Sequence, residues 1–137
     1  MELADTSAWT AKHRDAEASG SFDTNVRQGN VAICEVVRFE LLYSARDQRD
    51  FVAKRHALAA LTNVLITAPV WRRALDVFER FARQGPLHHR QVKFPDLLVA
   101  AAAELAELPV LHYDRHFELI GDVTGQPMRA IAPLGSL

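Results

Sequence analysis

The sequence predicts a single α/β domain with a central parallel sheet of about four to five short strands flanked by helices. Short apolar runs alternate with longer segments of helical spacing, which is the pattern of strands joined by helices. The 137 residues suffice for one ordinary domain, and no repeat or linker-like stretch divides them. Because strands joined by helices pair in parallel, both faces of the sheet should be covered. We therefore expect residues 1–137 to form one domain.

Five short apolar runs are the candidate strands. The first run ends at an acid, and the third is rich in β-branched residues, which favour extended backbone. The expected strands are Glu2–Ala4, Val31–Cys34, Val64–Thr67, Pro109–His112 and Met128–Ala132.

Helical spacing of apolar residues predicts the segments between these strands. Thr6 and Ser7 can cap the first helix, since a hydroxyl accepts hydrogen bonds from the unpaired backbone N–H groups there. Pro95 is a residue type typical of a helix start, and an alanine-rich run follows it. The expected helices are one from near Ala8, Val37–Arg46, one across Phe51–Leu61, Val70–Gly85, Pro95–Glu107 and His116–Ile120. The stretch from Ala18 to Asn30 has little apolar periodicity, so its structure stays open.

The composition excludes several classes of protein. With 49% hydrophobic and 24% charged residues, the chain is neither disordered nor fibrous. A formal net charge of −1 argues against a protein that coats nucleic acid. The one cysteine, Cys34, cannot form an intramolecular disulfide, which suits a reducing cytosol. The longest apolar run, Leu97–Ala103, is too short to span a membrane, and Glu2 and Asp5 replace the basic start of a signal peptide. We expect a cytoplasmic protein.

Four acids stand where a parallel sheet collects its ligands. Asp5 ends the first strand and Asp114 follows the fourth, and ligands bind outside the carboxyl ends of such strands. Asp96 lies in the first turn of the alanine-rich helix, and Glu40 lies inside an apolar helical segment, where a buried carboxylate would need a cation. Taken singly, each acid is most often an ordinary capping or solvated residue. If the four converge, they form an all-oxygen site that suits Mg²⁺ or Mn²⁺.

Four segments around these acids resemble the motifs of PIN-domain proteins, in the order in which that family carries them. The start of the chain is similar to the family's Asp-Thr-Ser motif after the first strand. The other segments resemble the second, third and fourth acidic motifs. The four segments are Leu3–Trp9, Val36–Arg46, Phe94–Ala103 and Pro109–Phe117. Length and motifs are most similar to the VapC-type toxins of bacterial toxin–antitoxin pairs.

The resemblance implies a small ribonuclease that uses Mg²⁺ or Mn²⁺ held by an acidic quartet. Asp5 and Asp96 would bind the metal directly, while Glu40 and Asp114 would hold its water or a second ion. The metal would activate water and offset charge on the scissile phosphate. Ser7 would orient the ligands through a hydrogen bond, and it can also be a plain helix cap. The family also implies a cognate VapB-type antitoxin and a homodimer, giving a heterotetramer or larger assembly with the antitoxin.

Two residues depart from the family pattern. Many relatives carry Thr at the place of His112 and a further Asp at the place of His116. The missing acid would weaken a second metal, although His116 could ligate Mn²⁺ or contact phosphate. The simpler interpretation of His116 is a surface residue at a helix start. A zinc site is disfavoured, since the two histidines do not share a helix face and Cys34 has no partner.

Charge is unevenly distributed along the chain. Residues 72–93 hold six Lys or Arg against two acids, whereas residues 96–122 hold six acids against Arg115 alone. A basic flank beside an acidic metal pocket would hold RNA phosphates, and a solvated helix face is an equally good interpretation. A weaker basic cluster comprises Arg46, Arg49, Lys54 and Arg55. The main aromatic residues, expected in the core or an interface, are Trp9, Phe22, Phe39, Trp71, Phe78 and Phe81.

Two other classes of function stay open at this point. A phospho-acceptor signalling domain is also a single α/β unit, but this chain has no acid at the end of Val64–Thr67 and no Lys after Lys93. A catalytically weak or silent module that keeps the PIN fold is the nearer alternative. The complete acidic quartet argues against a silent module, and the His112 and His116 departures leave it open.

Overall fold

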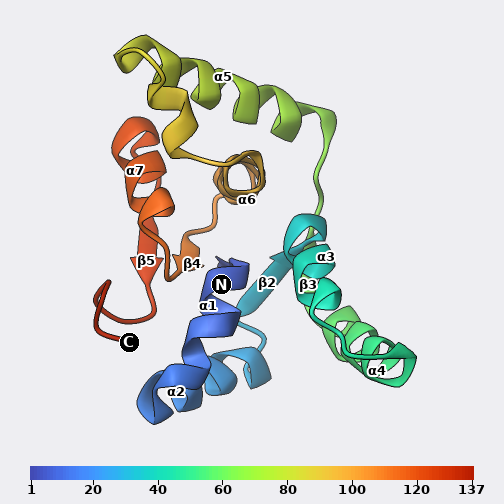
Figure 1. Ribbon diagram of the computed structural model, residues 1–137. Helices are drawn as coiled ribbons and strands as arrows, with labels where there is room; N and C mark the ends of the chain where they lie inside the picture. The colour runs from blue at the N-terminus through green and yellow to red at the C-terminus, as the bar shows by residue number, and fades with distance from the viewer.

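Five parallel strands form one sheet through the middle of the molecule (Figure 1). The computed structural model describes residues 1–137. The order of strands across the sheet is β3-β2-β1-β4-β5, so the first strand lies at the centre. The strands are β1 (Glu2–Ala4), β2 (Val31–Cys34), β3 (Thr62–Val64), β4 (Val110–His112) and β5 (Met128–Ala130). The predicted fold class is confirmed.

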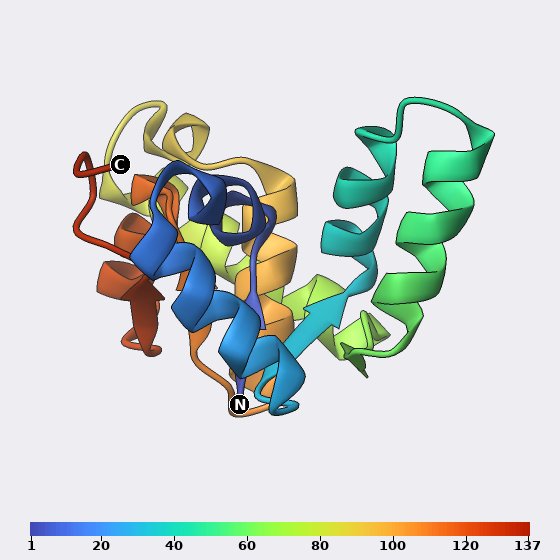
Figure 2. The ribbon, with the colours of Figure 1, turned by 90° about the horizontal axis from the view of Figure 1, so that it is seen from below.

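Five of the seven α-helices cover the sheet, with α1 and α2 on one face and α6 and α7, backed by α5, on the other (Figures 1 and 2). Two short 3-10 turns, Lys12–Arg14 and His88–Gln91, precede α2 and α6 respectively. The helices are α1 (Thr6–Ala11), α2 (Ala16–Arg27), α3 (Glu35–Tyr43), α4 (Gln48–Ala59), α5 (Ala68–Gln84), α6 (Phe94–Leu105) and α7 (Arg115–Thr124).

Helix α6 is the buried axis of the larger core. Its residues 97–103 are all buried, and four of them are alanines, whose small side chains let the helix approach the sheet closely. In Figure 1 this helix is seen end-on between α5 and the sheet. Arg73 of α5 forms a two-point ion pair with Glu104 of α6, which holds the outer helix against it. The rigid setting of α6 matters because its first turn carries Asp96.

A smaller core lies under the opposite face of the sheet. Ala4, Phe22, Val31 and Leu111 are buried there between the central strands and the α1–α2 pair. Trp9 of α1 packs edge-on against Phe22, with ring centroids 4.7 Å apart. This packing fixes the start of α1 against the end of β1 and so positions Asp5.

Helices α3 and α4 form an antiparallel hairpin that projects from the body of the molecule (Figure 2). Several large apolar side chains on it face solvent: Phe39 is 73% exposed and Tyr43 is 92% exposed. Trp71 on α5 is also half exposed. Phe39 and Trp71 are therefore not core residues. That they lie in an interface with another chain stays a prediction.

Two sequence expectations on local structure need correction, and one open stretch is now assigned. The open stretch from Ala18 to Asn30 lies mostly in α2, which buries only Phe22 and therefore shows little periodicity. The third strand is Thr62–Val64 rather than Val64–Thr67, because it pairs with β2 as an edge strand and the chain turns into α5 at Ala68. Helix α7 extends to Thr124, beyond the predicted end at Ile120, and stops at Gly125 in the left-handed conformation.

No helix of the protein combines the length and the apolar character needed to cross a membrane.

Candidate metal centre

The carboxyl ends of the parallel strands bring Asp5 and Asp114 to one edge of the sheet. Asp5 follows β1 and Asp114 follows β4, and these strands are direct neighbours. Each acid is the N-cap of the next helix: Asp5 Oδ2 accepts from the Ser7 N–H at 2.9 Å, and Asp114 Oδ1 accepts from the His116 N–H at 2.9 Å. Because capping occupies one oxygen of each carboxylate, these acids serve local structure and still have a second oxygen at the edge.

Ser7 ties the two strand ends together. Its hydroxyl donates to Asp5 Oδ2 at 2.6 Å and accepts from the backbone N–H of Tyr113 at 2.9 Å. Asp5 itself is only 5% exposed. Burial raises the pKa of Asp5, the Ser7 hydrogen bonds oppose that rise, and the negative charge of Glu40 adds to it.

Asp96 enters the same edge from the first turn of α6. The pKa of Asp96 is raised to about 6, chiefly because burial penalises the charged carboxylate. The hydrogen bond from His116 opposes this rise, and the charges of Asp5 and Asp114 add to it. The three carboxylates therefore lie close enough to repel one another, which is the electrostatic condition that a bound cation relieves.

Glu40 reaches the site from α3, but its surroundings differ from the prediction. The residue is exposed rather than buried among apolar side chains, because α3 turns this face to solvent. Its Oε1 accepts a hydrogen bond from the Thr6 hydroxyl at 2.9 Å, which aims the carboxylate toward the start of α1. Glu40 also acts on the pKa of Asp5, so the fourth predicted acid belongs to the same charged cluster.

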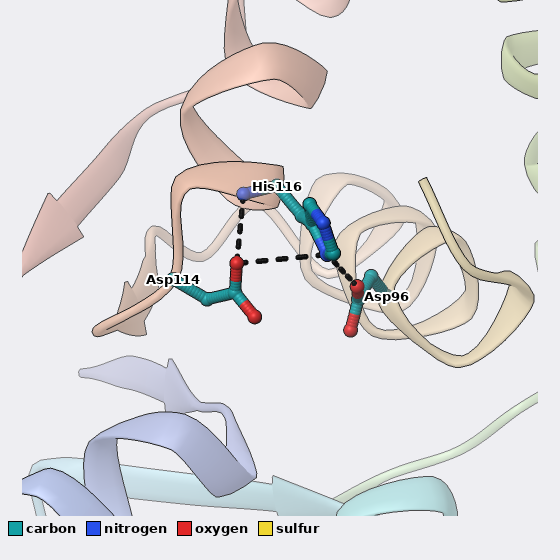
Figure 3. A group of neighbouring side chains, drawn as sticks. All are labelled: Asp96, Asp114 and His116. Carbon is teal, nitrogen blue, oxygen red and sulfur yellow. Dashed lines mark hydrogen bonds and ion pairs between the residues drawn. The ribbon is translucent and has the colours of Figure 1, made fainter. Parts of the chain in front are cut away.

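His116 lies within this cluster rather than on an open surface (Figure 3). Its Nδ1 is 3.0 Å from Asp96 Oδ2 and 3.5 Å from Asp114 Oδ1, and its side chain is 25% exposed. One ligand atom from each of these three residues lies within 4.8 Å of the others, which is close enough for a shared metal ion. The simpler interpretation of His116 as a plain surface histidine is therefore wrong.

His112 supports the loop that carries Asp114. The side chain is fully buried, its Nδ1 accepts from the Asp114 N–H at 3.2 Å, and its Nε2 lies 3.0 Å from Glu118 Oε1. The Nε2 contact does not meet hydrogen-bond angles, so Glu118 Oε1 is the nearest acceptor to Nε2 without forming a well-aligned hydrogen bond to it. Burial lowers the pKa of His112, and the Glu118 charge opposes this. The only signal in the sequence for this supporting role of His112 is that many relatives carry Thr at this position.

Some of the basic side chains form ion pairs with acids, and others form none. Arg73 and Arg83 pair with Glu104 and Glu79, and Asp50 is shared by Arg46 and Lys54. The remaining basic residues of the 72–93 segment form no ion pair: Arg72, Arg80, Arg90 and Lys93. Lys93 is the exposed N-cap residue of α6, three positions before Asp96.

The sequence model of the PIN domain family matches residues 3–123, a span that includes all four acids. The chain belongs to the PIN-domain family. It is 38% identical to ribonuclease VapC18 of Mycobacterium tuberculosis over 97% of this chain and 96% of that protein. Ribonuclease VapC51 of the same organism is 41% identical over 80% of this chain and 77% of its own length. The predicted resemblance to VapC-type PIN proteins is confirmed.

Solved structures confirm the PIN fold independently of close sequence likeness. The Salmonella typhimurium VapBC bound to DNA superimposes with a TM-score of 0.72 at 20% identity, covering 96% of this chain and 100% of that one. VapBC2 from Rickettsia felis, bound to a promoter DNA fragment, also gives 0.72, at 13% identity over 94% and 97% of the two chains. This PIN domain therefore carries its charged cluster at the strand ends of an established fold.

Proposed function

We propose that this PIN domain is a VapC-type toxin, an endoribonuclease that hydrolyses RNA phosphodiesters with a divalent cation, Mg²⁺ or Mn²⁺. The observation that supports this proposal most is the group of Asp96, Asp114 and His116, whose ligand atoms lie within 4.8 Å of one another. The nearby charge of Asp5 adds to the raised pKa of Asp96, which is about 6. The similarity to ribonucleases VapC18 and VapC51 points to the same chemistry.

The donor set fits a hard divalent cation. Carboxylate oxygens are the ligands that Mg²⁺ and Mn²⁺ prefer, and the cluster lacks the thiolates that would favour zinc. Asp5 and Asp96 are the proposed direct ligands, with Glu40 and Asp114 holding water or a second ion. A bound cation would supply Lewis acidity that activates water and offsets charge on the phosphate.

The chain's own residues hold this arrangement in place. Ser7 fixes the Asp5 carboxylate and the loop before Asp114, and Thr6 fixes Glu40. The buried ring of His112 accepts a hydrogen bond from the backbone N–H of Asp114 and so fixes this part of the loop. Pre-set ligands lose little conformational freedom when a cation and substrate bind, so their positioning contributes directly to the rate.

RNA phosphates would contact the basic residues next to the acids. Lys93 and Arg90 precede α6, form no ion pair, and lie close in sequence to Asp96. Their charges would hold the backbone of the RNA beside the carboxylate cluster without reading its sequence.

The proposed partners are a VapB-type antitoxin and a second copy of this chain, in a heterotetramer or larger assembly. The structural neighbours are toxin–antitoxin complexes. The α3–α4 hairpin exposes Phe39 and Tyr43 and encloses a groove of about 420 Å³, a patch suited to an amphipathic partner.

A second apolar surface on α5 and α6, with Trp71, Leu75 and Phe94 exposed, is proposed as the homodimer contact. The proposed compartment is the cytoplasm, where RNA and antitoxin would both be present.

RNA cleavage by the purified chain, freed of antitoxin, tests the function. Total RNA and defined hairpins would be incubated with Mg²⁺, Mn²⁺ or EDTA, and the products separated on denaturing gels. We expect discrete cuts that EDTA removes and that Asp96→Asn lowers at least about 100-fold.

The matched control for this assay is Asp122→Asn, which removes an exposed acid of α7 that forms no ion pair. It should cleave as the wild type does. Cleavage that survives EDTA, or that is equal in the two variants, would reject the proposed chemistry. A wild type that binds RNA without cutting it would favour the silent PIN-fold module instead.

A further inference from the structure

The imidazole of His116 occupies a ligand position in the carboxylate cluster. The residue stands in the first turn of α7, and its own backbone N–H is bonded to Asp114 Oδ1. The ring is 25% exposed, and its Nδ1 faces the carboxylates of Asp96 and Asp114, as Figure 3 shows. Without a cation, Nδ1 donates its proton to Asp96 Oδ2 at 3.0 Å. In the other neutral tautomer the proton sits on Nε2, and Nδ1 then has a lone pair that can bind a cation in place of that proton.

We propose that His116 binds the divalent cation through Nδ1 and makes this site prefer Mn²⁺ over Mg²⁺. The inference rests on the proposed function, which places a divalent cation among these acids. It concerns a residue that departs from the all-acid pattern of the fourth motif, and it chooses between the two metals that the acids alone accept equally.

The spacing of the donor atoms fits shared ligation. In an octahedral site with metal–ligand distances of about 2.1 Å, neighbouring ligand atoms are about 3.0 Å apart. Nδ1 of His116 lies 3.0 Å from Asp96 Oδ2, and the Asp114 Oδ1 atom is 3.5 Å away. Nδ1 and Asp96 Oδ2 can therefore occupy adjacent corners of one coordination shell with little movement of either residue.

The chemistry of the donor decides the preference. Mg²⁺ binds oxygen ligands almost exclusively and keeps several of its waters, so a fixed nitrogen in its shell is a poor substitute. Transition metals accept imidazole readily, and affinity for nitrogen rises along the series that begins with Mn²⁺. An imidazole in place of a carboxylate leaves the cluster one negative charge less, which weakens the electrostatic attraction for both divalent ions. The nitrogen donor therefore makes the difference between the two metals.

The test is electron spin-echo spectroscopy of the purified full-length chain loaded with Mn²⁺. We expect modulation from a directly bound nitrogen in the wild type, its loss in His116→Gln and His116→Asp, and its retention in His56→Gln, which changes an exposed histidine of α4. Calorimetric titration with each metal should show that His116→Asp lowers the ratio of Mn²⁺ to Mg²⁺ affinity about tenfold.

Three outcomes would overturn the inference: a Mn²⁺-loaded wild type without nitrogen modulation, an affinity ratio that His116→Asp leaves unchanged, or no Mn²⁺ binding at all. A wild-type spectrum without nitrogen modulation overturns the inference even if a variant fails to fold, and the two substitutions of His116 give separate chances to assign the nitrogen. RNA cleavage in the absence of nitrogen modulation would leave the proposed nuclease standing without this ligand. Nitrogen modulation in a chain that cuts no RNA would keep His116 as a metal ligand and reject the proposed nuclease activity.

Discussion

The hydroxyl of Ser7 and the backbone N–H of Tyr113 are 2.9 Å apart, although 106 positions separate the two residues in sequence. The same hydroxyl donates to Asp5 at 2.6 Å. One small side chain therefore joins the end of β1 to the end of β4 and sets the distance between Asp5 and the loop of Asp114. Asp-Thr-Ser at the start of the chain is more than a helix cap, since its serine organises the proposed metal centre.

Replacing Ser7 by alanine should weaken both the fold and the proposed activity. The change leaves the Tyr113 N–H without its partner and frees the Asp5 carboxylate, at a cost of about 1–3 kcal/mol in the free energy of unfolding. RNA cleavage should fall by about tenfold or more because a metal ligand loses its orientation. Urea unfolding and cleavage assays would measure the two effects. Ser21→Ala, on the exposed side of α2, is the control, and equal behaviour of the two variants would contradict the role given to Ser7.

Asp96→Asn should stabilise the metal-free chain, and more so at neutral than at acidic pH. The pKa of Asp96 is about 6 in the folded chain against 3.8 in an ordinary carboxyl, so the folded state holds this proton more tightly than the unfolded state. Stability is therefore lost as pH rises from about 4 through 6 and the carboxylate becomes charged. An amide cannot ionise and escapes this loss.

Thermal unfolding in EDTA at pH 5 and pH 7.5 would measure this effect. The melting temperature of Asp96→Asn should exceed that of the wild type by about 3 °C at pH 7.5, with a clearly smaller difference at pH 5. Asp122→Asn should show no such pH-dependent gap, because it changes an exposed acid outside the cluster. A gap that stays constant between the two pH values would mean that Asp96 titrates normally.

Glu118→Ala should destabilise the chain by about 1–2 kcal/mol, because it strips the buried Nε2 of His112 of its nearest acceptor. Glu118→Gln keeps an oxygen at that place and should recover most of the loss. Denaturant unfolding at pH 7.5 would compare both with Asp122→Ala on the same helix, which should stay within about 0.5 kcal/mol of the wild type. If the alanine and glutamine variants are equally stable, His112 does not depend on this contact.

Leu75→Glu should break the proposed homodimer without disturbing the fold. Leu75 is 64% exposed and lines an apolar groove on α5 and α6 together with Trp71 and Phe94. A charge buried in a dimer contact is costly, whereas the same charge on a monomer surface is nearly neutral. Light scattering coupled to gel filtration should show a dimeric wild type and a monomeric variant with unchanged circular dichroism. A variant that stays dimeric would place the contact elsewhere.

The strand and acid pattern of the sequence predicts much of this molecule because the relevant constraints are local. A short apolar run followed by an acid and a hydroxyl, as at Asp5 and Ser7, encodes a strand end and a helix cap at once. Parallel pairing then brings Asp5 and Asp114 to one edge without further information. Pro95 and the alanines mark α6, and with it the place of Asp96.

The features that sequence reasoning missed depend on tertiary packing. Helix α2 buries one large residue, Phe22, so its apolar period is too weak to read. Glu40 stands among apolar neighbours in sequence, yet it lies on the face of α3 that is turned to solvent together with Phe39, while Val37 on the opposite face is buried. His116 looks like a surface histidine until the start of α7 is set beside Asp96, 20 positions earlier. The spacing of apolar residues along the chain cannot predict such contacts between distant segments.

The central claim is that acids from separate segments form one metal centre, and anomalous diffraction from crystals soaked in Mn²⁺ tests it most directly. We predict one strong peak within about 2.3 Å of carboxylate oxygens from Asp5 or Asp96, and none in crystals of Asp96→Asn soaked in the same way. A peak only at other surface acids, or an equal peak in Asp96→Asn, would contradict the claim.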